Sequence, residues 1–397
     1  MKAGELLDGR YDLVGELGRG TFGVVFEAFD RRLGRQVAVK ALRNRGTGEE
    51  AGDLLRLYRE VDVLAQLSHP NIVAVYDKSE VAAEGERYHF IVMELLNGQT
   101  LKQVLAAGRP ELLQALDWAG QLCAALAAAH AARVIHRDVK PENIMFARPD
   151  RQLLKVLDFG IAQIGDNRDG LTTDGVVIGS TPYLAPERWR GEPGTVRSDL
   201  YAVGCVLYEL LTGARPFTAT TTYSLMVQHL EEPVPSPAAL PADLTRLLFQ
   251  LLAKDPAERP VDAAEVGRRL ARATDAVHDL RRRADAAFEA ALDGRPQEAV
   301  DRLRPLIEHF ALAFGKDDGR TLRTCHDLAV ALERLGRPDE AYCLLAELLP
   351  ASAAALGEDH PDTVAVQRRL TRLAVPEQPC APGLLAALLG DVNRAAD

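Results

Sequence analysis

The chain has 397 residues, and its 47% apolar and 26% charged residues are ordinary for a globular protein of two or three domains. The formal net charge of −10 argues against non-specific nucleic-acid binding, which depends on clustered positive charge. The five cysteines are scattered and no two are spaced as CxxC. We therefore expect neither a disulfide framework nor a zinc site, and we expect a reducing compartment.

The sequence carries no pattern typical of a membrane span or an export signal. No run of about 18 apolar residues occurs in it. The nearest candidate, residues 122–132, is short, rich in alanine and interrupted by His130, so we interpret it as a buried core helix. Because the N-terminal residues lack an apolar stretch of signal-peptide length, we expect a cytoplasmic protein.

The predicted elements change in kind along the chain. Side chains alternate at residues 24–29, a turn follows at 30–36, and residues 37–40 are apolar up to a lysine, which predicts a hairpin within residues 11–40. Residues 49–67 carry apolar side chains at helical spacing, and residues 89–96 are strand-like. Periodic Ala- and Leu-rich segments predominate from residue 111 onward, apart from a loop-rich stretch at 136–187. A small β-rich part therefore precedes a larger helical part.

A second region begins near residue 275 and contains an internal repeat. Shifting the sequence by 42 places aligns residues 294–315 with residues 336–357, and 10 of the 22 aligned positions are identical. Each unit is predicted to contain a helix, a Gly-Arg-Pro turn, a second helix and a loop that starts at Gly315 or Gly357. A third unit starts at Asp362 and stops near residue 374. A linker at 375–383 and one short helix within 384–397 complete the chain.

A glycine-rich stretch provides the first chemical signal. A dinucleotide-binding turn would require a helix directly after the glycines and an acidic residue about 20 positions later. Here a strand follows, and Lys40 stands 20 residues after Gly20. Two readings remain, a surface hairpin and a hairpin whose backbone closes over phosphates, because glycines leave room for that approach. The stretch reads Gly18, Arg19, Gly20, Thr21, Phe22, Gly23, Val24 and Val25.

Four further motifs follow in order. Lys40 ends an apolar strand, and Glu60 lies on the next predicted helix at a position suited to pair with it; taken singly, each is an ordinary surface charge. Phosphoryl transfer requires a carboxylate that orients a hydroxyl and oxygen ligands for Mg²⁺, which Asp138, Asn143 and Asp158 supply. These three residues stand in the segments His-Arg-Asp-Val-Lys-Pro-Glu-Asn at 136–143 and Asp-Phe-Gly at 158–160, and the segment 179–187 ends in Ala-Pro-Glu.

With these five motifs, the sequence resembles the eukaryotic-like (Hanks-type) serine/threonine protein kinases of bacteria. The resemblance covers about residues 11–271, and segment 198–217 and Arg259 also match. It implies a bilobal α+β fold with a small antiparallel-sheet lobe and one helix at about 11–95, followed by a helical lobe at about 96–271. The implied reaction transfers the γ-phosphate of ATP to Ser or Thr hydroxyls of protein substrates.

The resemblance also implies roles for single residues. Asp138 would be the catalytic base, and Lys140 would neutralise the transferring phosphoryl group. Lys40 would bind the α- and β-phosphates and pair with Glu60. Asn143 and Asp158 would hold Mg²⁺, or Mn²⁺ in its place. ATP would lie under the loop from Leu17 to Val25, with its adenine among Val25, Ala38, Met93, Glu94, Leu96 and Met145.

Other matched positions would support or regulate this site. Asp199 would brace the catalytic loop, and Glu187 would pair with Arg259. Thr181 would contact Asp138 and Lys140 and help to select a hydroxyl substrate. Lys140, two residues after Asp138, follows the serine/threonine pattern rather than the tyrosine one.

The resemblance further suggests a switch in the loop at 161–178. Arg137 would pair with a phosphorylated residue there, because guanidinium and phosphate match bidentately. The candidates are Thr172 and Thr173, and the alternative is an exposed polar loop without a regulatory role.

The repeats at 275–374 resemble tetratricopeptide repeats of the 42-residue kind. Such stacks offer a concave face that binds a protein or peptide partner. The alternative is an inert cap or a dimerisation surface, which would make the chain a homodimer. We interpret the arginines between 268 and 283 as a solvated helix face rather than a nucleic-acid site. For the whole chain, the rival to a kinase is a binding scaffold that uses the kinase fold as a nucleotide-gated platform.

Overall fold

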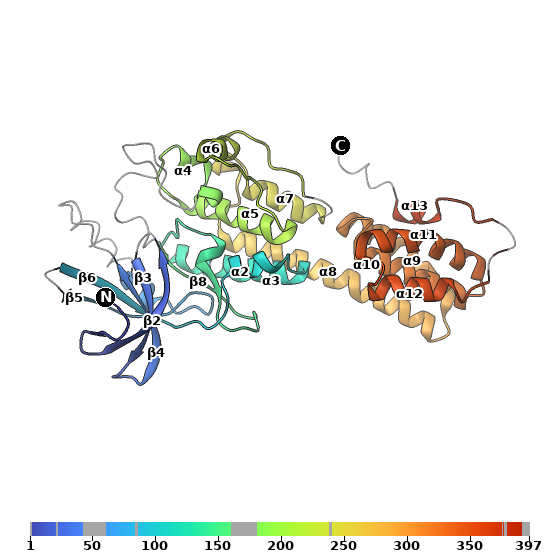
Figure 1. Cartoon of the computed structure of the whole chain (residues 1–397). Helices are drawn as coiled ribbons and strands as arrows, with labels where there is room; N and C mark the ends of the chain where they lie inside the picture. Colours follow the sequence, from blue (N-terminus) through green and yellow to red (C-terminus); the bar gives the residue numbers. More distant parts are fainter. Residues whose placement is uncertain are drawn as a thin grey trace. The chain divides into compact units, whose positions relative to one another are not determined.

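The structure is a computed structural model, and it describes residues 2–20, 23–42, 61–83, 86–159, 181–237, 240–374, 376 and 379–390 (Figure 1). The chain forms two compact units, one of Met1–Pro235 with Leu247–Ala271 and one of Ser236–Arg246 with Arg272–Asp397. Several predicted site residues lie outside the described residues. They are Thr21, Phe22, Glu60, Thr172 and Thr173, together with the side chain of Thr181.

The first unit opens with a six-stranded antiparallel sheet, drawn in blue around the N label in Figure 1. The strand order is β1-β2-β3-β4-β6-β5, so neighbours in sequence are mostly neighbours in the sheet. A helical segment at residues 61–66 lies between β4 and β5. The strands are β1 (Leu6–Leu7), β2 (Tyr11–Gly20), β3 (Gly23–Asp30), β4 (Arg35–Leu42), β5 (Val75–Ala83) and β6 (Glu86–Met93).

Alternating side chains give this sheet its buried face. In β3, Val24, Phe26 and Ala28 are buried, and they pack against Tyr11 of β2 and Phe90 of β6. Val37 and Val39 of β4 belong to the same cluster. The hairpin predicted within residues 11–40 is therefore confirmed as the antiparallel pairs of β2 with β3 and β3 with β4.

A helical part follows the sheet along the chain, and its last two helices, α7 and α8, each contribute residues to both units. Its central helices are α3 (Leu112–Ala131) and α5 (Val196–Thr212), which pack against each other. The α+β fold with a sheet lobe and a helical lobe is therefore confirmed. The other elements are α2 (Leu101–Ala107), the 3₁₀ turns Pro141–Asn143, Thr181–Tyr183 and Pro256–Glu258, β7 (Ile144–Phe146), β8 (Leu154–Val156), α4 (Pro186–Trp189), α6 (Thr222–Leu230), α7 (Ala242–Leu251) and α8 (Ala263–Leu292).

Helix α3 is the one helix in the described part of the chain with the length and apolar composition of a membrane span. Its side chains Trp118, Leu122 and Leu126 are 1% exposed or less, and it contacts α5 and β8. A helix that packs against neighbours on several sides needs apolar side chains on several sides. These contacts therefore account for the apolar composition of α3.

The second unit contains the helices that the internal repeat predicts. Helix α9 (Pro296–Phe314) and helix α11 (Pro338–Leu356) begin and end 42 residues apart, and each ends at a glycine with positive φ, 94° at Gly315 and 98° at Gly357. Helix α10 (Gly319–Arg334) packs against both, and α12 (Pro361–Leu370) packs against α11. The repeated helix pattern is therefore present, whereas its kinship with tetratricopeptide repeats stays a prediction.

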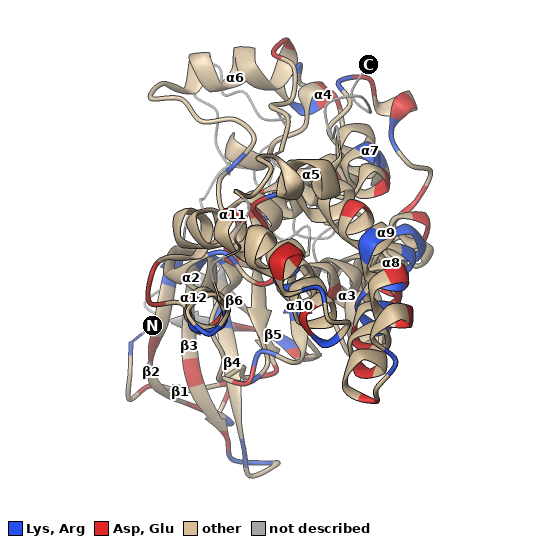
Figure 2. Ribbon diagram, turned by 90° about the vertical axis from the view of Figure 1, so that its right-hand side faces the viewer, with Lys and Arg blue, Asp and Glu red and all other residues tan. Residues whose placement is uncertain are grey.

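Helix α8 runs without a break through the end of the predicted kinase segment and the start of the predicted repeats. Its basic residues are accompanied by acidic ones, as Figure 2 shows for the blue and red segments of α8 and α9. Arg282 and Arg283 both pair with Asp279, which lies three and four residues before them. These pairs are what a solvated helix face provides.

The expectation that the cysteines form no disulfide is wrong. Cys343 of α11 forms a disulfide with Cys380, 37 residues later, with a Cα–Cα distance of 5.4 Å. Rules based on short spacing do not detect such a pair, because the fold brings the two residues together after the intervening α12. The remaining cysteines, Cys123, Cys205 and Cys325, are free and buried.

Candidate active site

The described residues of the glycine-rich stretch lie at the end of β2 and the start of β3. Gly20 is paired with Gly23, and Gly18 is paired with Val25. The guanidinium of Arg19 lies 2.7 Å from the Glu16 carboxylate on the same strand, and the side chain of Leu17 is 53% exposed. The predicted phosphate-binding loop is therefore flanked by the backbone of β2 and β3. The side chain of Arg19 pairs with Glu16 on the same strand.

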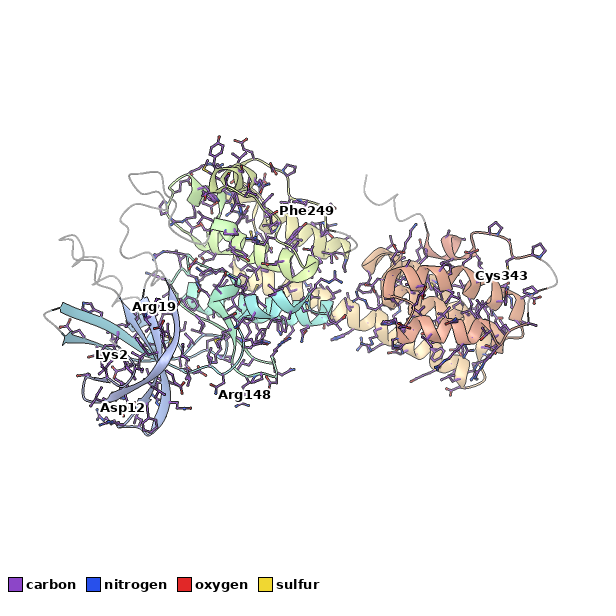
Figure 3. All side chains as sticks on the ribbon, viewed as in Figure 1. Lys2, Asp12, Arg19, Arg148, Phe249 and Cys343 are labelled. Atoms are coloured by element: carbon purple, nitrogen blue, oxygen red, sulfur yellow. A yellow bond between two sulfur atoms is a disulfide. The ribbon has the colours of Figure 1, made fainter. Side chains whose placement is uncertain are left out.

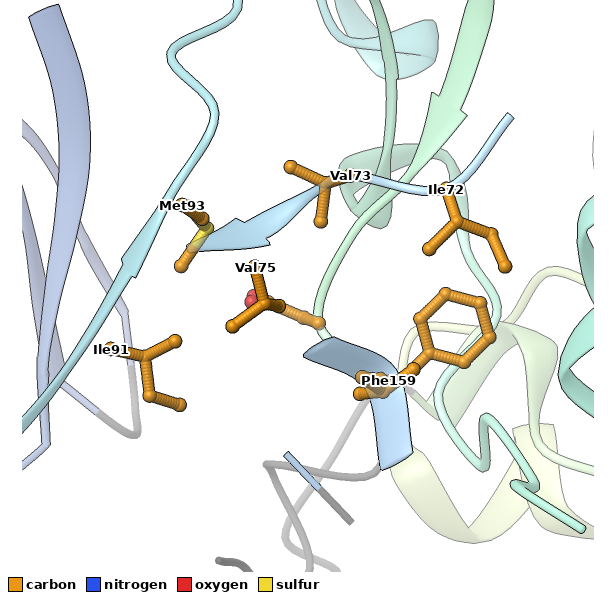
Figure 4. A pocket seen from close by; sticks show the side chains of 8 residues that line it. Ile72, Val73, Val75, Ile91, Met93 and Phe159 are labelled. Carbon is orange, nitrogen blue, oxygen red and sulfur yellow. The ribbon is translucent and has the colours of Figure 1, made fainter. Parts of the chain in front are cut away.

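Three of the predicted adenine residues share one apolar cluster. Ala38 of β4 is paired with Met93 at the end of β6, and Val25 of β3 packs against the buried cluster that contains them. Figure 4 shows a small apolar pocket, whose lining includes Met93, Val75, Ile91 and Phe159. Met145, which is half-buried, lies on β7. The cluster therefore presents an apolar surface on this side of the sheet, as the predicted adenine contact would require.

The segment after β6 is held by a residue that the sequence analysis did not single out. Lys155 of β8 is 7% exposed, and its ammonium lies 2.9 Å from the Glu94 carboxylate and 3.3 Å from the Ile72 carbonyl oxygen. The backbone N–H of Glu94 also donates to the Ala74 carbonyl. Both bonds fix the backbone on which Glu94 and Leu96 lie. A Cβ on Gly98 would stand 2.1 Å from the Phe146 carbonyl oxygen, so only glycine fits there.

Lys40 and Asp158 meet at the centre of the candidate site. The ammonium of Lys40, 6% exposed on β4, lies 2.7 Å from a carboxylate oxygen of Asp158. Burial alone would raise the pKa of Asp158, but the adjacent Lys40 charge lowers it overall. Asp158 has φ of 58°, an uncommon backbone conformation for a residue other than glycine. Glu60, the predicted partner of Lys40, lies outside the described residues.

The loop after α3 brings two predicted catalytic residues, Asp138 and Lys140, into contact with the predicted metal ligand Asn143. The Lys140 ammonium donates to Asp138 Oδ2 at 2.7 Å. The Asn143 side-chain amide donates to the same oxygen and to the Asp138 carbonyl, both at 2.9 Å. The Asp138 carboxylate is therefore oriented through Oδ2 by a cation and an amide.

Buried Asp199 of α5 holds the backbone of this loop. One of its oxygens accepts from the His136 N–H and the other from the Arg137 N–H, each at 2.8 Å. The His130 ring donates to the first oxygen from α3, also at 2.8 Å. Arg137 has φ of 65°, a conformation that these bonds impose. The His136 ring connects the loop to Leu157, just before Asp158, through a bond of 2.8 Å to its carbonyl.

Glu187 and Arg259 form a buried bidentate ion pair. Two guanidinium nitrogens donate to the two carboxylate oxygens at 2.7 and 2.8 Å. Ser198 Oγ donates to the same carboxylate at 2.7 Å. Burial would raise the pKa of Glu187, but the Arg259 hydrogen bonds lower it overall. The pair anchors α4, the helix directly after the segment that contains Thr181.

The donor chemistry of the site fits a divalent cation that prefers oxygen ligands. Asn143 uses its amide nitrogen in both contacts with Asp138, which leaves its oxygen as the ligand atom. Asp158 contributes a carboxylate. In the described ranges, no group of three or more His, Cys, Asp or Glu side chains could hold a metal ion by itself. A cation here would therefore depend on Asn143, Asp158 and the phosphates of its substrate.

Residues 11–268 match the family model for the protein kinase domain, and the chain belongs to this family. The match spans strands β2 to β6, the loop after α3 and the Glu187–Arg259 pair, whose geometry is described above.

Curated relatives extend this finding. A probable serine/threonine-protein kinase of Streptomyces coelicolor is 39% identical over 300 residues, which cover 74% of this chain and 42% of the relative. The serine/threonine-protein kinase PknB of Mycobacterium tuberculosis is 42% identical over 266 residues, which cover 66% of this chain and 42% of the relative. The chain thus matches about two fifths of the length of these relatives.

Proposed function

We propose that the protein is a serine/threonine protein kinase that uses Mg·ATP. The observation that carries the proposal is the contact of Asp138 with both Lys140 and Asn143, beside the Lys40–Asp158 pair. The names of the relatives support the choice of Ser and Thr as acceptors. Lys140, two residues after Asp138, agrees with that choice.

Each residue has a task in this reaction. Asp138 accepts a hydrogen bond from the substrate hydroxyl and orients its oxygen toward the phosphorus. Lys140, already on Asp138, offsets negative charge as the phosphoryl group moves. Lys40 exchanges part of its contact with Asp158 for oxygens of the α- and β-phosphates. Asn143 and Asp158 would hold Mg²⁺, which when bound neutralises phosphate charge.

The test is phosphate transfer from labelled ATP to the protein itself and to a generic basic protein. Wild type should transfer phosphate, and Asp138→Asn should bind ATP but transfer at a rate lower by about 10²–10³-fold, the usual effect of removing one electrostatic group. Asp243→Asn changes an exposed carboxylate outside the site and should match wild type. Equal and substantial rates for Asp138→Asn and wild type would overturn the role of Asp138. Absence of transfer by the folded wild-type protein would overturn the proposal and favour a nucleotide-gated scaffold.

Two finer proposals accompany the kinase activity. Autophosphorylation of Thr172 or Thr173 would activate the enzyme through Arg137, whose backbone Asp199 already holds. The helices of the second unit would bind a protein or peptide and bring substrates to the kinase. The regular 42-residue spacing of α9 and α11 supports the second proposal, because stacked helix pairs expose an extended surface. A cytoplasmic location also stays a proposal.

A further inference from the structure

The C-terminal helix α13 (Leu384–Leu389) lies on the two equivalent helices of the repeat, α9 and α11 (Figure 1). Leu385 and Leu389, one turn apart, are 8% and 6% exposed, while Ala386 and Ala387 between them are exposed. The tail helix therefore inserts one leucine edge into the face that α9 and α11 form.

A carboxylate on α11 receives the beginning of this helix. Glu347 accepts hydrogen bonds from the backbone N–H groups of Gly383, Leu384 and Leu385, at 2.8, 3.2 and 2.8 Å. The first N–H groups of a helix have no partner within the helix, so a carboxylate placed there satisfies them and favours one direction of the chain. The surface formed by α9 and α11 therefore suits a helix that has leucines along one edge and its N-terminus at Glu347.

The disulfide ties the same segment to the same helix. Cys343 precedes Glu347 by one turn on α11, and it bonds to Cys380, three residues before Gly383 (Figure 3). Both cysteines are half-buried, whereas Cys325 of α10 is buried and its thiol pKa is raised to about 12 by that burial. A thiol reagent in solution thus meets the bridge before it meets the other cysteines of the chain.

Repeat packing does not require these two α11 residues. The equivalents of Cys343 and Glu347, 42 places earlier on α9, are Asp301 and Pro305. The two helices nevertheless have the same length and the same caps. The cysteine and the carboxylate are therefore features of this docking face and not of the repeat fold.

A helix of six residues is too short to persist by itself in water. Two buried leucines and one capping carboxylate must offset the entropy that is lost when residues 379–390 become ordered. The disulfide, which reduces that entropy loss, therefore determines what fraction of molecules has α13 packed on α9 and α11. We propose that the α9–α11 face is a docking site for a short leucine-rich helix, and that the Cys343–Cys380 bridge keeps it filled by the chain's own α13. Opening the bridge makes the face available to a second helix of the same pattern.

The bridge opens by thiol–disulfide exchange with a dithiol reductant. One reductant thiolate attacks a cysteine sulfur, forms a mixed disulfide with it and expels the other cysteine as a thiolate, which takes up a proton. The second reductant thiolate then attacks the reductant sulfur of the mixed disulfide, closes the reductant's own disulfide and expels the remaining cysteine as a thiolate, which is protonated in turn. Two electrons and two protons pass to Cys343 and Cys380, and the reductant leaves as a disulfide. An oxidised dithiol reverses the exchange.

Hydrogen exchange of the full-length chain tests the tether. Amides of residues 383–389 should exchange at least about tenfold faster after reduction with dithiothreitol, and reoxidation should restore the slow rate. Cys343→Ser should exchange fast under both conditions, and Cys325→Ser, which removes a buried free thiol, should behave as wild type. Equal exchange in the oxidised and reduced protein would refute the role of the bridge.

A labelled peptide of residues 379–390, with serine in place of Cys380, tests the face itself. The receptor is full-length Cys343→Ser carrying Leu385→Asp and Leu389→Asp, whose own tail cannot seat. It should bind the peptide saturably, and adding Glu347→Lys should weaken binding by about tenfold or more. Oxidised wild type should bind none. A receptor that is folded by circular dichroism yet ignores the peptide would overturn the docking site.

Discussion

The ammonium of Lys40 and the carboxylate of Asp158 form a 2.7 Å ion pair that joins β4 of the sheet lobe to the segment after β8. Both residues come from motifs that imply contact with ATP, one through phosphates and one through a metal ion. In the proposed function, phosphates and a metal ion would compete for the two charges that now pair with each other. Nucleotide binding would therefore replace part of this contact. The ammonium of Lys40, which now pairs with the Asp158 carboxylate, would then pair with phosphate oxygens.

The first prediction concerns Lys40. Lys40→Met should fold normally, because the methionine side chain suits the apolar strand, but phosphate transfer should fall by about 10²–10³-fold since one electrostatic stabiliser is lost. The pKa of Asp158 should rise, because the main charge that lowers it is absent. Initial rates with labelled ATP measure the effect, and Lys316→Met, an exposed site in the second unit, is the control. Wild-type turnover in Lys40→Met would contradict the assignment.

The second prediction concerns the activation segment. After incubation with Mg·ATP, mass spectrometry should find phosphate on Thr172 or Thr173 in wild type and none in Asp138→Asn. Replacing both threonines with alanine should lower transfer to a generic substrate by about tenfold or more, because Arg137 loses its phosphate partner. A fully active enzyme with an unmodified loop would remove the basis for this switch.

The third prediction concerns the buried pair Glu187–Arg259. Arg259→Met should cost about 3–5 kcal/mol of unfolding free energy, because it leaves a buried carboxylate without its cation. Arg246→Met removes an exposed pair with Asp243 and should cost about 0–1 kcal/mol. Urea unfolding followed by tryptophan fluorescence suits the measurement, since Trp189 lies on α4 beside Glu187. Similar losses in the two variants would show that burial adds nothing to the pair.

Local sequence patterns predict the elements and motifs of this protein well. Alternation along β3 predicts a strand with Val24, Phe26 and Ala28 on one face, and these side chains are buried together. The 42-residue shift predicts two equivalent helices, and α9 and α11 agree at both ends. Such features depend on neighbours in the sequence or on a simple period, so the sequence carries them directly.

Contacts between distant segments are what the sequence does not reveal. In the sequence, Lys155 is a single charged residue in a short strand. Only the fold shows that its ammonium pairs with the Glu94 carboxylate. Cys343 and Cys380 have no recognisable spacing, because α12 and its loop separate them. The positive φ of Arg137 likewise accompanies a backbone hydrogen bond to distant Asp199, which no local pattern reveals.

The fourth prediction concerns acid stability of the sheet lobe. Buried Asp30 accepts from Arg10 at 2.7 and 2.8 Å, and these bonds lower its pKa from 3.8 to about 2. Because the folded pKa is below the unfolded one, the interaction stabilises the protein above about pH 4 and is lost as the pH falls through about 2. The stability difference between wild type and Asp30→Asn should be constant near neutrality and shrink below about pH 4. Denaturant unfolding over this pH range measures it, and a difference that persists undiminished at the acid end would refute the assignment.

The fifth prediction separates recruitment from catalysis. A chain that ends at Ala273 retains the catalytic residues and the α8 residues up to Ala271 that belong to the first unit, and it lacks α9 to α13. It should still phosphorylate itself and a generic protein, because Lys40, Asp138 and Asp158 are intact.

The native substrate, identified by comparing the phosphoproteins of wild-type and Asp138→Asn cells, should be phosphorylated more slowly by the shortened chain. Its local concentration falls when the docking helices are gone, and effective concentrations in the millimolar range give typical gains of about 10²–10⁴. Rates on both substrates, for full-length and shortened protein, decide the matter. If the shortened chain is folded by circular dichroism but inert toward every substrate, the second unit supports or activates the kinase fold, and recruitment is not its role.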